Sequence, residues 1–271
     1  MDKKFIGLLT RCKDEFFIKE FCDYYLLQGV DMIYIIDDDS NDKSIYNNIN
    51  NDKIKIFYKK NIINRNIANK IYKQIKNDFT WMIYVDVDEF ITTKKNINNT
   101  IKQELETTFK EYDCIKIPWV MMACNNIDKN PESVLKTNIY RWNHNKKHQH
   151  KIQKFRCRFW NIEVKCIFKT EKFNNITDHY PTGFISKNVS IIDSIKLKKQ
   201  RIANYYNKLR EEDIENGYLL CYHYRIISRE NSENKLKNNK WYIENGYTIE
   251  DLMSSDHSEI LDKTLKNKSN K

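Results

Sequence analysis

Strand-like and helix-like patterns alternate through the first ninety residues, and this feature constrains the fold more than any other. Four short apolar runs are typical of buried strands: 5–10, 32–36, 54–58 and 81–85. Between them, segments 15–28 and 63–76 place apolar side chains at helical spacing. Parallel strands need long crossover connections, which are usually helices, so this order predicts a mainly parallel sheet flanked by helices.

Beyond residue 90 the rhythm changes, and the patterns predict a mixed sheet with antiparallel members. The expected helices are 97–109, 199–216 and 234–245. The expected strands are 114–120, 162–169 and 218–224. We therefore expect one α/β domain over residues 1–253, followed by a polar, frayed tail at 254–271.

Composition excludes several classes of protein. With five glycines, the chain has no Gly-x-Gly-x-x-Gly motif and no Walker loop, which excludes Rossmann dehydrogenases and P-loop NTPases. No apolar run approaches a membrane span, and no apolar signal core follows Met1, so we expect a cytoplasmic protein. The seven cysteines never stand as Cys-x-x-Cys, which favours buried, reduced thiols over disulfides or a zinc site.

The formal net charge of +10 is unevenly distributed. Residues 1–100 carry 16 basic and 15 acidic side chains, whereas the remaining residues carry 31 and 22. The densest basic segment, 141–158, holds seven Lys or Arg and no acidic residue. Two interpretations stay open for it: a site for a polyanion, or a solvated loop enriched in lysine by AT-rich codon usage.

The strongest chemical signal is the pair Asp86 and Asp88, directly after an apolar strand. Alternate residues of an extended segment face the same way, so both carboxylates can converge on one site. Their mutual repulsion would be relieved by a divalent cation, which prefers oxygen ligands. The alternative is that the pair caps the next turn or meets surface lysines.

Polar residues also follow the first two expected strands. Thr10, Arg11 and Asp14 follow the first strand, and the acidic run 37–39 follows the second. Each could be an N-cap or a turn on its own. Because the carboxyl ends of parallel strands meet at one edge, their coincidence with Asp86 and Asp88 predicts a nucleotide site there.

These motifs, in order and spacing, resemble the GT-A glycosyltransferases of the family 2 and family 92 type. The resemblance rests on Thr10-Arg11-Cys12-Lys13-Asp14-Glu15, on 24–31, on 34–42 and on 81–90, and continues weakly through 164–169, 178–181 and 222–225. The family usually opens with Arg-Asn-Glu, so the sequence Arg11-Cys12-Lys13-Asp14 departs from it.

The resemblance implies a GT-A type, Rossmann-like fold with a nucleotide-sugar-binding half at 1–95 and an acceptor-side half at 96–253. It implies that Asp38 contacts the nucleobase or ribose of a UDP- or GDP-sugar. Asp86 and Asp88 would hold Mn²⁺ or Mg²⁺ on the diphosphate, with His179 as a third ligand. The acceptor would be a glycan or another hydroxyl compound.

Charge chemistry suggests the remaining roles. Cations must offset the negative charge that develops on the leaving diphosphate, and the candidates are Lys165, Arg225 and Lys235. An inverting reaction also needs a general base for the acceptor hydroxyl, and Glu89 and Asp178 are the candidates. His223, Trp119 and Trp142 are weaker site candidates, the tryptophans for stacking on a sugar.

Two alternatives remain to the metal-dependent glycosyltransferase. A basic nucleic-acid-binding protein would show salt-sensitive affinity for nucleic acid that Asp86→Ala leaves unchanged. We regard nucleic acid as the less favoured partner. A nucleotidyltransferase would share the metal and the nucleotide but would form a different product.

Overall fold

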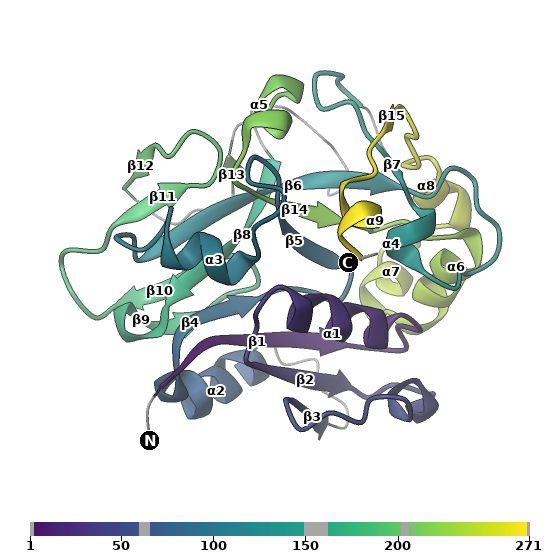
Figure 1. The fold of residues 1–271 in the computed structure, drawn as a ribbon. Helices are drawn as coiled ribbons and strands as arrows, with labels where there is room; N and C mark the ends of the chain where they lie inside the picture. Colours follow the sequence, from purple (N-terminus) through teal and green to yellow (C-terminus); the bar gives the residue numbers. More distant parts are fainter. Residues whose placement is uncertain (1–2, 60–65, 149–161, 202–205, 208, 270–271) are drawn as a thin grey trace.

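A large mixed β-sheet runs through the middle of the protein, with helices on both of its faces (Figure 1). The computed structural model describes residues 3–59, 66–148, 162–201, 206–207 and 209–269. The strands are β1 (Lys4–Cys12), β2 (Met32–Asp38), β3 (Ile54–Lys59), β4 (Phe79–Tyr84), β5 (Glu89–Thr93), β6 (Cys114–Ala123), β7 (Tyr140–Arg141), β8 (Ile162–Lys169), β9 (Phe173–Ile176), β10 (Pro181–Phe184), β11 (Ile191–Asp193), β12 (Lys199–Gln200), β13 (Tyr206–Asn207), β14 (Leu219–His223) and β15 (Ile260–Leu261). The helices are α1 (Ile18–Leu27), α2 (Asn66–Ile75), α3 (Ile101–Glu106), α4 (Val134–Thr137), α5 (Glu211–Asn216), α6 (Arg229–Asn238), α7 (Lys240–Glu244), α8 (Ile249–Met253) and α9 (Thr264–Ser269).

The sheet has the expected α/β character. Its main path is β12-β11-β6-β8-β4-β1-β2-β3. Strands β1 to β4 pair in parallel, and β8 is antiparallel to both β4 and β6. Strands β6 and β11 therefore run in the same direction as β1 to β4, and the sheet is mainly parallel, as predicted. The carboxyl ends of β1, β2 and β4 consequently face one edge of the sheet.

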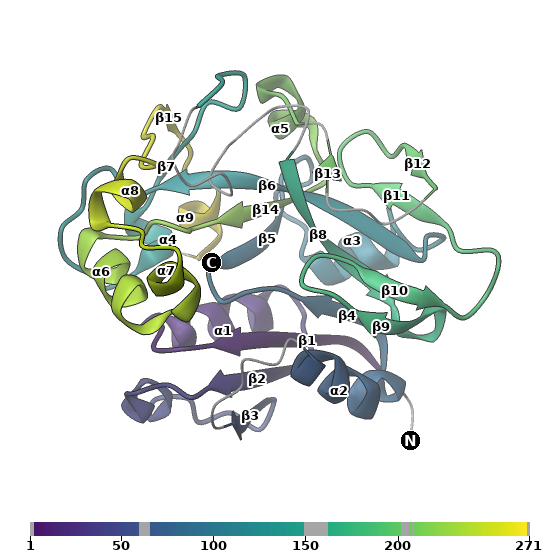
Figure 2. The same ribbon diagram turned by 180° about the vertical axis from the view of Figure 1, so that it is seen from behind.

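The first two helices cover opposite faces of this sheet. Ile6 and Leu8 of β1 pack in one apolar cluster with Phe21 of α1, whereas Leu9 packs in a second cluster with Tyr72 of α2. This division follows from the alternation of side chains along a strand. Helix α1 lies in front of the sheet in Figure 1 and α2 in front of it in Figure 2.

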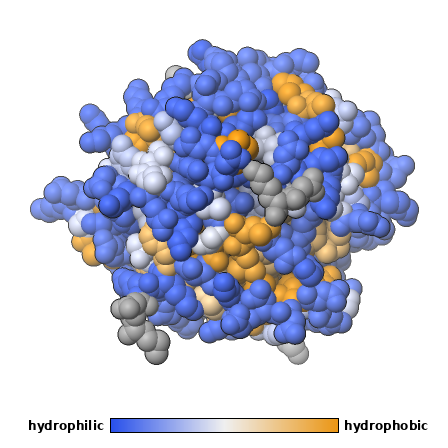
Figure 3. Space-filling view, in the orientation of Figure 1, coloured by the Kyte–Doolittle hydropathy of each residue, from blue (hydrophilic) through white to orange (hydrophobic). Residues whose placement is uncertain are grey.

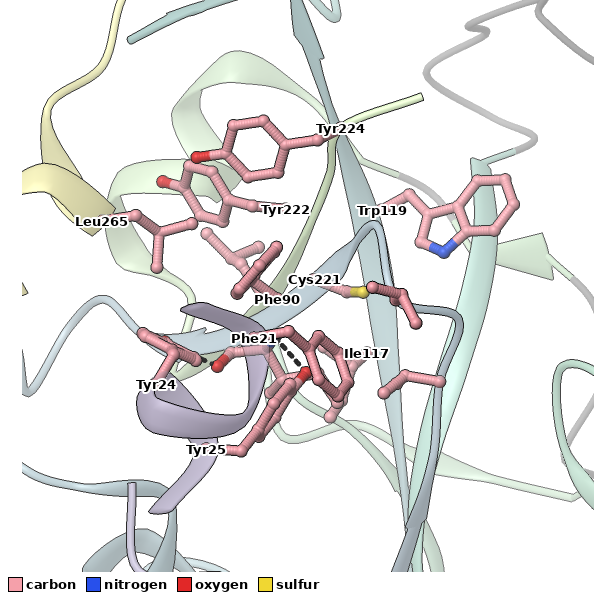
Figure 4. Close-up of a cluster of buried hydrophobic side chains, with 14 of the residues drawn as sticks. Phe21, Tyr24, Tyr25, Phe90, Ile117, Trp119, Cys221, Tyr222, Tyr224 and Leu265 are labelled. Atoms are coloured by element: carbon pink, nitrogen blue, oxygen red, sulfur yellow. Dashed lines mark hydrogen bonds between the residues drawn. The ribbon is translucent and has the colours of Figure 1, made fainter. Parts of the chain in front are cut away.

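An aromatic cluster links α1 to strand β5 (Figure 4). The hydroxyl of Tyr24 donates to the carbonyl of Ile91 at 2.8 Å, and that of Tyr25 donates to the carbonyl of Glu89 at 2.9 Å. The phenyl ring of Phe90 meets that of Phe21 edge-on, with 5.6 Å between centroids. These contacts fix β5, which begins directly after the acidic pair.

Three expected helices need correction. The segment 199–216 is not one helix: it contains β12, β13 and, at its end, α5. Strand β13 pairs with β8, so sheet pairing overrides the helical spacing of the sequence. The helix expected at 234–245 is divided between α6 and α7 at Asn239, whose side chain accepts a hydrogen bond from the amide of Trp241. Helix α3 is shorter than the expected 97–109, because a capping box of Thr100 and Gln103 starts it later.

The polar end of the chain packs into the fold, so the expectation that it frays is wrong. Strand β15 pairs with β7, and Leu265 of α9 is 2% exposed. Asp262 accepts hydrogen bonds from Nε of Arg141 at 3.0 Å and from the hydroxyl of Tyr222 at 2.9 Å. The ammonium of Lys268 donates to the carbonyl of Asn99 at 2.9 Å. Buried polar contacts thus anchor a segment whose composition alone suggested disorder.

We expect Asp262→Ala to lower the free energy of unfolding by about 3 kcal/mol, because it removes one partner of a buried ion pair. Burial by itself raises the pKa of Asp262, but Lys94 and the hydrogen bonds from Thr264 outweigh it and lower that pKa. The stability that ionised Asp262 contributes to the folded state is therefore present above about pH 4. It is lost as the pH falls through the folded-state pKa of Asp262. Urea unfolding at neutral and acidic pH measures both effects. The exposed Asp52→Ala is the control, and an equal loss in the two variants would contradict the prediction.

In the described part of the basic segment, residues 141–148, Lys146 and Lys147 are exposed, as a solvated loop predicts, but Arg141 and His144 are buried. Arg141 is 3% exposed and its guanidinium forms ion pairs with Asp262 and Glu211. His144 is fully buried and accepts a hydrogen bond from the amide of Met121 at 3.2 Å. These side chains are part of the packed interior, and the rest of the segment, 149–158, lies outside the described residues.

The described cysteines agree with the expectation of buried, reduced thiols. The six cysteines within the described ranges are buried and free, and Cys157 lies outside those ranges.

Figure 3 shows a mostly hydrophilic surface with separate hydrophobic patches on this side. Among the helices of the described residues, none combines the length and apolar character needed to cross a bilayer.

Candidate active site

A cavity of about 460 Å³ opens at the edge of the sheet where β1, β2 and β4 end. Helices α6 and α7 contribute to its other side. Many of the expected site residues line it together: Arg11, Asp14, Asp38, Asp86, Asp88, Asp178, Arg225 and Lys235. The strand ends therefore bring together residues that are far apart in the sequence, as the parallel arrangement predicts.

Asp86 is held in the ionised form by two cations. One carboxylate oxygen lies 3.0 Å from the ammonium of Lys165, and the other lies 3.7 Å from the guanidinium of Arg11. Burial by itself raises the pKa of Asp86, but Lys165 and Arg11 outweigh it and lower the pKa to about 2. A full negative charge therefore faces the cavity at neutral pH.

Asp88 has its own cationic partner and a histidine beside it. Its carboxylate lies 3.1 Å from the ammonium of Lys235 and 3.5 Å from Nε2 of His223. The amide of Tyr224 donates to the carbonyl of Asp88 at 2.8 Å, which ties the end of β14 to this turn. Burial opposes ionisation, yet Lys235 and His223 hold the pKa of Asp88 well below its ordinary value.

Glu89 and Lys165 form a buried layer next to the acidic pair and do not line the cavity. Glu89 is fully buried, accepts a hydrogen bond from the amide of Asp86 at 2.7 Å and lies 3.0 Å from Lys165. Burial raises the pKa of Glu89 to about 8, although Lys165 opposes that rise. Lys165 also donates to the carbonyl of Asp178 at 2.7 Å, so it connects the acidic pair to the turn between β9 and β10.

Asp178 and His179, neighbours on that turn, are placed differently. The carboxylate of Asp178 lines the cavity 3.5 Å from the guanidinium of Arg11. His179 directs Nδ1 to the carbonyl of Val164 at 3.1 Å, and its Nε2 lies 3.8 Å from the carboxylate of Glu163. Burial, followed by the charge of Lys165, lowers the pKa of His179 to about 4, so the ring is neutral.

The expected metal-ligand set of Asp86, Asp88 and His179 is therefore not assembled. Across the described ranges, no group of three His, Cys, Asp or Glu side chains is placed to hold a metal ion. The histidine beside the acidic pair is His223, because β14 ends against the turn that carries Asp88. The sequence motif around 178–181 did not reveal which way the ring of His179 turns.

Thr10 is buried within the fold, and Asp14 binds a neighbouring loop. Thr10 is fully buried in β1 and does not line the cavity. Asp14 lines it, but its carboxylate accepts hydrogen bonds from the side chain of Asn41 and the amide of Asp42, each at 3.0 Å. Asp14 therefore fastens the loop after β1 to the loop after β2, beside Asp38.

The expected tryptophans are buried instead of facing a ligand. Trp119 is 4% exposed and Trp142 is 1% exposed, so neither offers a free ring face to a sugar. The ring of Trp119 packs against that of His223 with 4.2 Å between centroids. The guanidinium of Arg225 lies 5.8 Å from the centroid of Trp119. Trp119 thus supports two residues that line the cavity.

Sequence reasoning missed several cavity residues: Glu15, Asn231, Trp241 and Tyr242. Glu15 directly follows Asp14 in the opening motif, and its carboxylate lies 3.6 Å from the ammonium of Lys235. Position in the motif was a usable signal for Glu15. Asn231, Trp241 and Tyr242 had no such signal, because packing against the loop after β1 brings α6 and α7 to the cavity.

A family model for glycosyltransferase family 92 matches residues 72–266, well over half of the chain. The chain belongs to glycosyltransferase family 92. Its motif resemblance is thereby confirmed, and this family 92 protein is a glycosyltransferase with a sugar donor and an acceptor. The matched range includes the acidic pair and the later motifs that contribute to the cavity.

The family 92 chain is distantly similar to several solved structures. One is 4-diphosphocytidyl-2C-methyl-D-erythritol synthase from Anaerococcus prevotii, with 9% identity, coverage of 79% of this chain and 96% of that chain, and a TM-score of 0.37. Another is HddC from Yersinia pseudotuberculosis, with 10% identity, coverage of 70% and 90%, and a TM-score of 0.35. The sequence matches no curated protein.

Proposed function

We propose that this glycosyltransferase transfers a sugar from a nucleotide-sugar, with UDP- and GDP-sugars as the leading donors, to an acceptor hydroxyl. The reaction depends on a divalent cation and inverts the anomeric configuration. The observation that carries the proposal is the placement of two ionised carboxylates, Asp86 and Asp88, in one cavity with Arg11, Arg225 and Lys235. Such a cavity suits a diphosphate with its cation.

The acidic pair fits Mn²⁺ or Mg²⁺ as part of a complex with the donor. Two carboxylates do not complete a coordination shell, but Mg²⁺ is commonly bound by one or two carboxylates together with substrate phosphates. Asp86 and Asp88 would hold the ion, which would neutralise charge on the diphosphate. Their contacts with Lys165 and Lys235 keep both carboxylates ionised beforehand.

The cations of the cavity stabilise the departing nucleoside diphosphate. Arg11 enters from β1, Arg225 follows β14, and Lys235 comes from α6. Fixed positive charges aimed at developing negative charge lower the barrier without reorganisation during the reaction. Asp38, at the end of β2 on the same cavity wall, would contact the ribose or the base. Residues 1–95 would then bind chiefly the nucleotide, and 96–253 chiefly the acceptor.

Asp178 is the better of the two candidates for the general base. A base must reach the hydroxyl proton that it removes. Asp178 lines the cavity, whereas Glu89 is fully buried outside its lining. We assign Glu89 a positioning role, because its carboxylate accepts the hydrogen bond from the amide of Asp86.

Thermal unfolding with a panel of nucleotide-sugars tests the donor and the metal together. A ligand that binds only the folded state raises the melting temperature, by an amount that grows with its concentration over Kd. We expect one donor type to raise it in the presence of Mn²⁺ and not with EDTA. Asp86→Asn should lose this shift, whereas the exposed Asp52→Asn should keep it.

Three outcomes of this experiment would count against the proposal. A donor shift that persists in EDTA would refute the metal dependence. No shift with any nucleotide-sugar would refute the donor class. With a responsive donor, release of a sugar phosphate in place of a nucleoside diphosphate would indicate nucleotidyl transfer.

A further inference from the structure

The segment between β10 and β11 exposes large apolar side chains at the edge of the molecule. Phe184 and Ile185 are each 50% exposed. They line a shallow surface groove of about 370 Å³ together with Val189, Lys187 and Arg201. Figures 1 and 2 show this segment projecting outward beside β11 and β12, away from α6 and α7.

The segment that carries these apolar residues is also basic, and Lys187 and Arg201 line the groove. Between residues 182 and 201 the chain carries five Lys or Arg, all exposed: Lys187, Lys196, Lys198, Lys199 and Arg201. The one acidic residue of this stretch, Asp193, is buried. Its carboxylate accepts hydrogen bonds from the amides of Ile195, Lys196 and Lys198. The buried acid thus shapes the turn that presents the lysines.

We propose that this face binds the surface of an anionic lipid bilayer. The face, here called the β10–β11 surface, consists of the groove residues Phe184, Ile185, Lys187, Val189 and Arg201. Exposed aromatic and aliphatic side chains enter the headgroup region, and neighbouring Lys and Arg are attracted to anionic lipids. An aliphatic side chain such as Ile185 gains nothing from nucleic-acid phosphates, so the combination favours a membrane over a polyanion.

The β9–β10 hairpin connects this surface with the catalytic cavity. Asp178 lies on the turn at one end of the hairpin, and Phe184 pairs with Phe173 at the other end. Six residues of extended chain span about 20 Å at about 3.3 Å per residue. A membrane bound at Phe184 would therefore lie within about 20 Å of Asp178, at a distance suited to an acceptor that extends from a lipid. The proposal does not depend on the metal or the donor.

Co-sedimentation of the full chain with lipid vesicles tests the proposal. We expect binding to vesicles of phosphatidylcholine with phosphatidylserine, little binding to phosphatidylcholine alone, and weaker binding as salt rises. Phe184→Ser combined with Ile185→Ser should weaken binding about tenfold or more, because it removes the inserted apolar area. Lys187→Glu combined with Arg201→Glu should weaken it at least as much.

Matched variants distinguish a defined surface from general positive charge. Lys53→Glu with Lys55→Glu reverses two exposed lysines at the start of β3, and Leu27→Ser removes an apolar side chain that is 56% exposed. Both should bind vesicles like the unmodified chain. Equal weakening by the two charge-reversal pairs, or no binding to phosphatidylserine at low salt, would overturn the proposal. Binding of an oligonucleotide that depends on Lys187 and Arg201, without vesicle binding, would replace it with a nucleic-acid surface.

Discussion

Asp88→Asn is expected to lower kcat/KM for sugar transfer by about 10³-fold, since it removes one of the two carboxylate charges that we propose to hold the cation on the diphosphate. The substitution keeps the size of the side chain, and Lys235 retains Glu15 at 3.6 Å as a partner. Release of nucleoside diphosphate, measured over a range of Mn²⁺ concentrations, gives the effect. The requirement for Mn²⁺ should move to higher concentration in the variant.

Asp39→Asn is the matched control for this experiment. Asp39 lies in the acidic run after β2, does not line the cavity and has a φ of 58°, which asparagine tolerates. Its activity should stay within about twofold of the unmodified enzyme, because a surface charge outside the cavity has little effect. Activity of Asp88→Asn that equals this control would remove Asp88 from the donor site.

Asp178→Asn is expected to lower kcat by about 10² to 10⁴-fold, the usual contribution of a general base. The KM for the donor should change little, because Asp86 and Asp88 remain in place. In a plot of rate against pH, the fall in rate at low pH, called the acidic limb, should also disappear in this variant. Initial rates with varied donor and acceptor, measured across pH, separate these effects.

Glu89→Gln distinguishes the two candidate bases. Glutamine can still accept the hydrogen bond from the amide of Asp86, so a positioning role predicts a smaller loss than in Asp178→Asn. The acidic limb of the pH profile should also persist. If Glu89→Gln loses the larger share of kcat and that limb, Glu89 is the base and the assignment of Asp178 is wrong.

The sequence predicted those parts of the site that depend on strand order. Arg11, Asp38 and Asp86 each stand where a strand of the parallel half ends, so local pattern and sheet direction suffice to place them on one edge. To place Glu15 and His223 at the site, one must also know their contacts: Glu15 lies beside Lys235, and His223 lies beside Asp88.

Features that depend on tertiary packing were harder to predict. The ring of His179 turns toward Val164 and Glu163 because of its turn, which spacing along the chain does not encode. The segment 199–216 has helical spacing, yet pairing of β13 with β8 determines part of its structure. The end of the chain is polar in composition, but Asp262 meets Arg141, which lies far away in sequence.

The position of β8 in the sheet determines when β4 and β6 can be joined. Strand β8 lies between β4 and β6, and its register pairs Lys169 with the much earlier Trp81. A nascent chain that ends before residue 162 therefore leaves one edge of β4 and one edge of β6 without a strand. Unpaired apolar edges promote intermolecular association, and pairings this distant in sequence form slowly. While the ribosome has made residues 1–161 but not β8, these unpaired edges expose the nascent protein to aggregation.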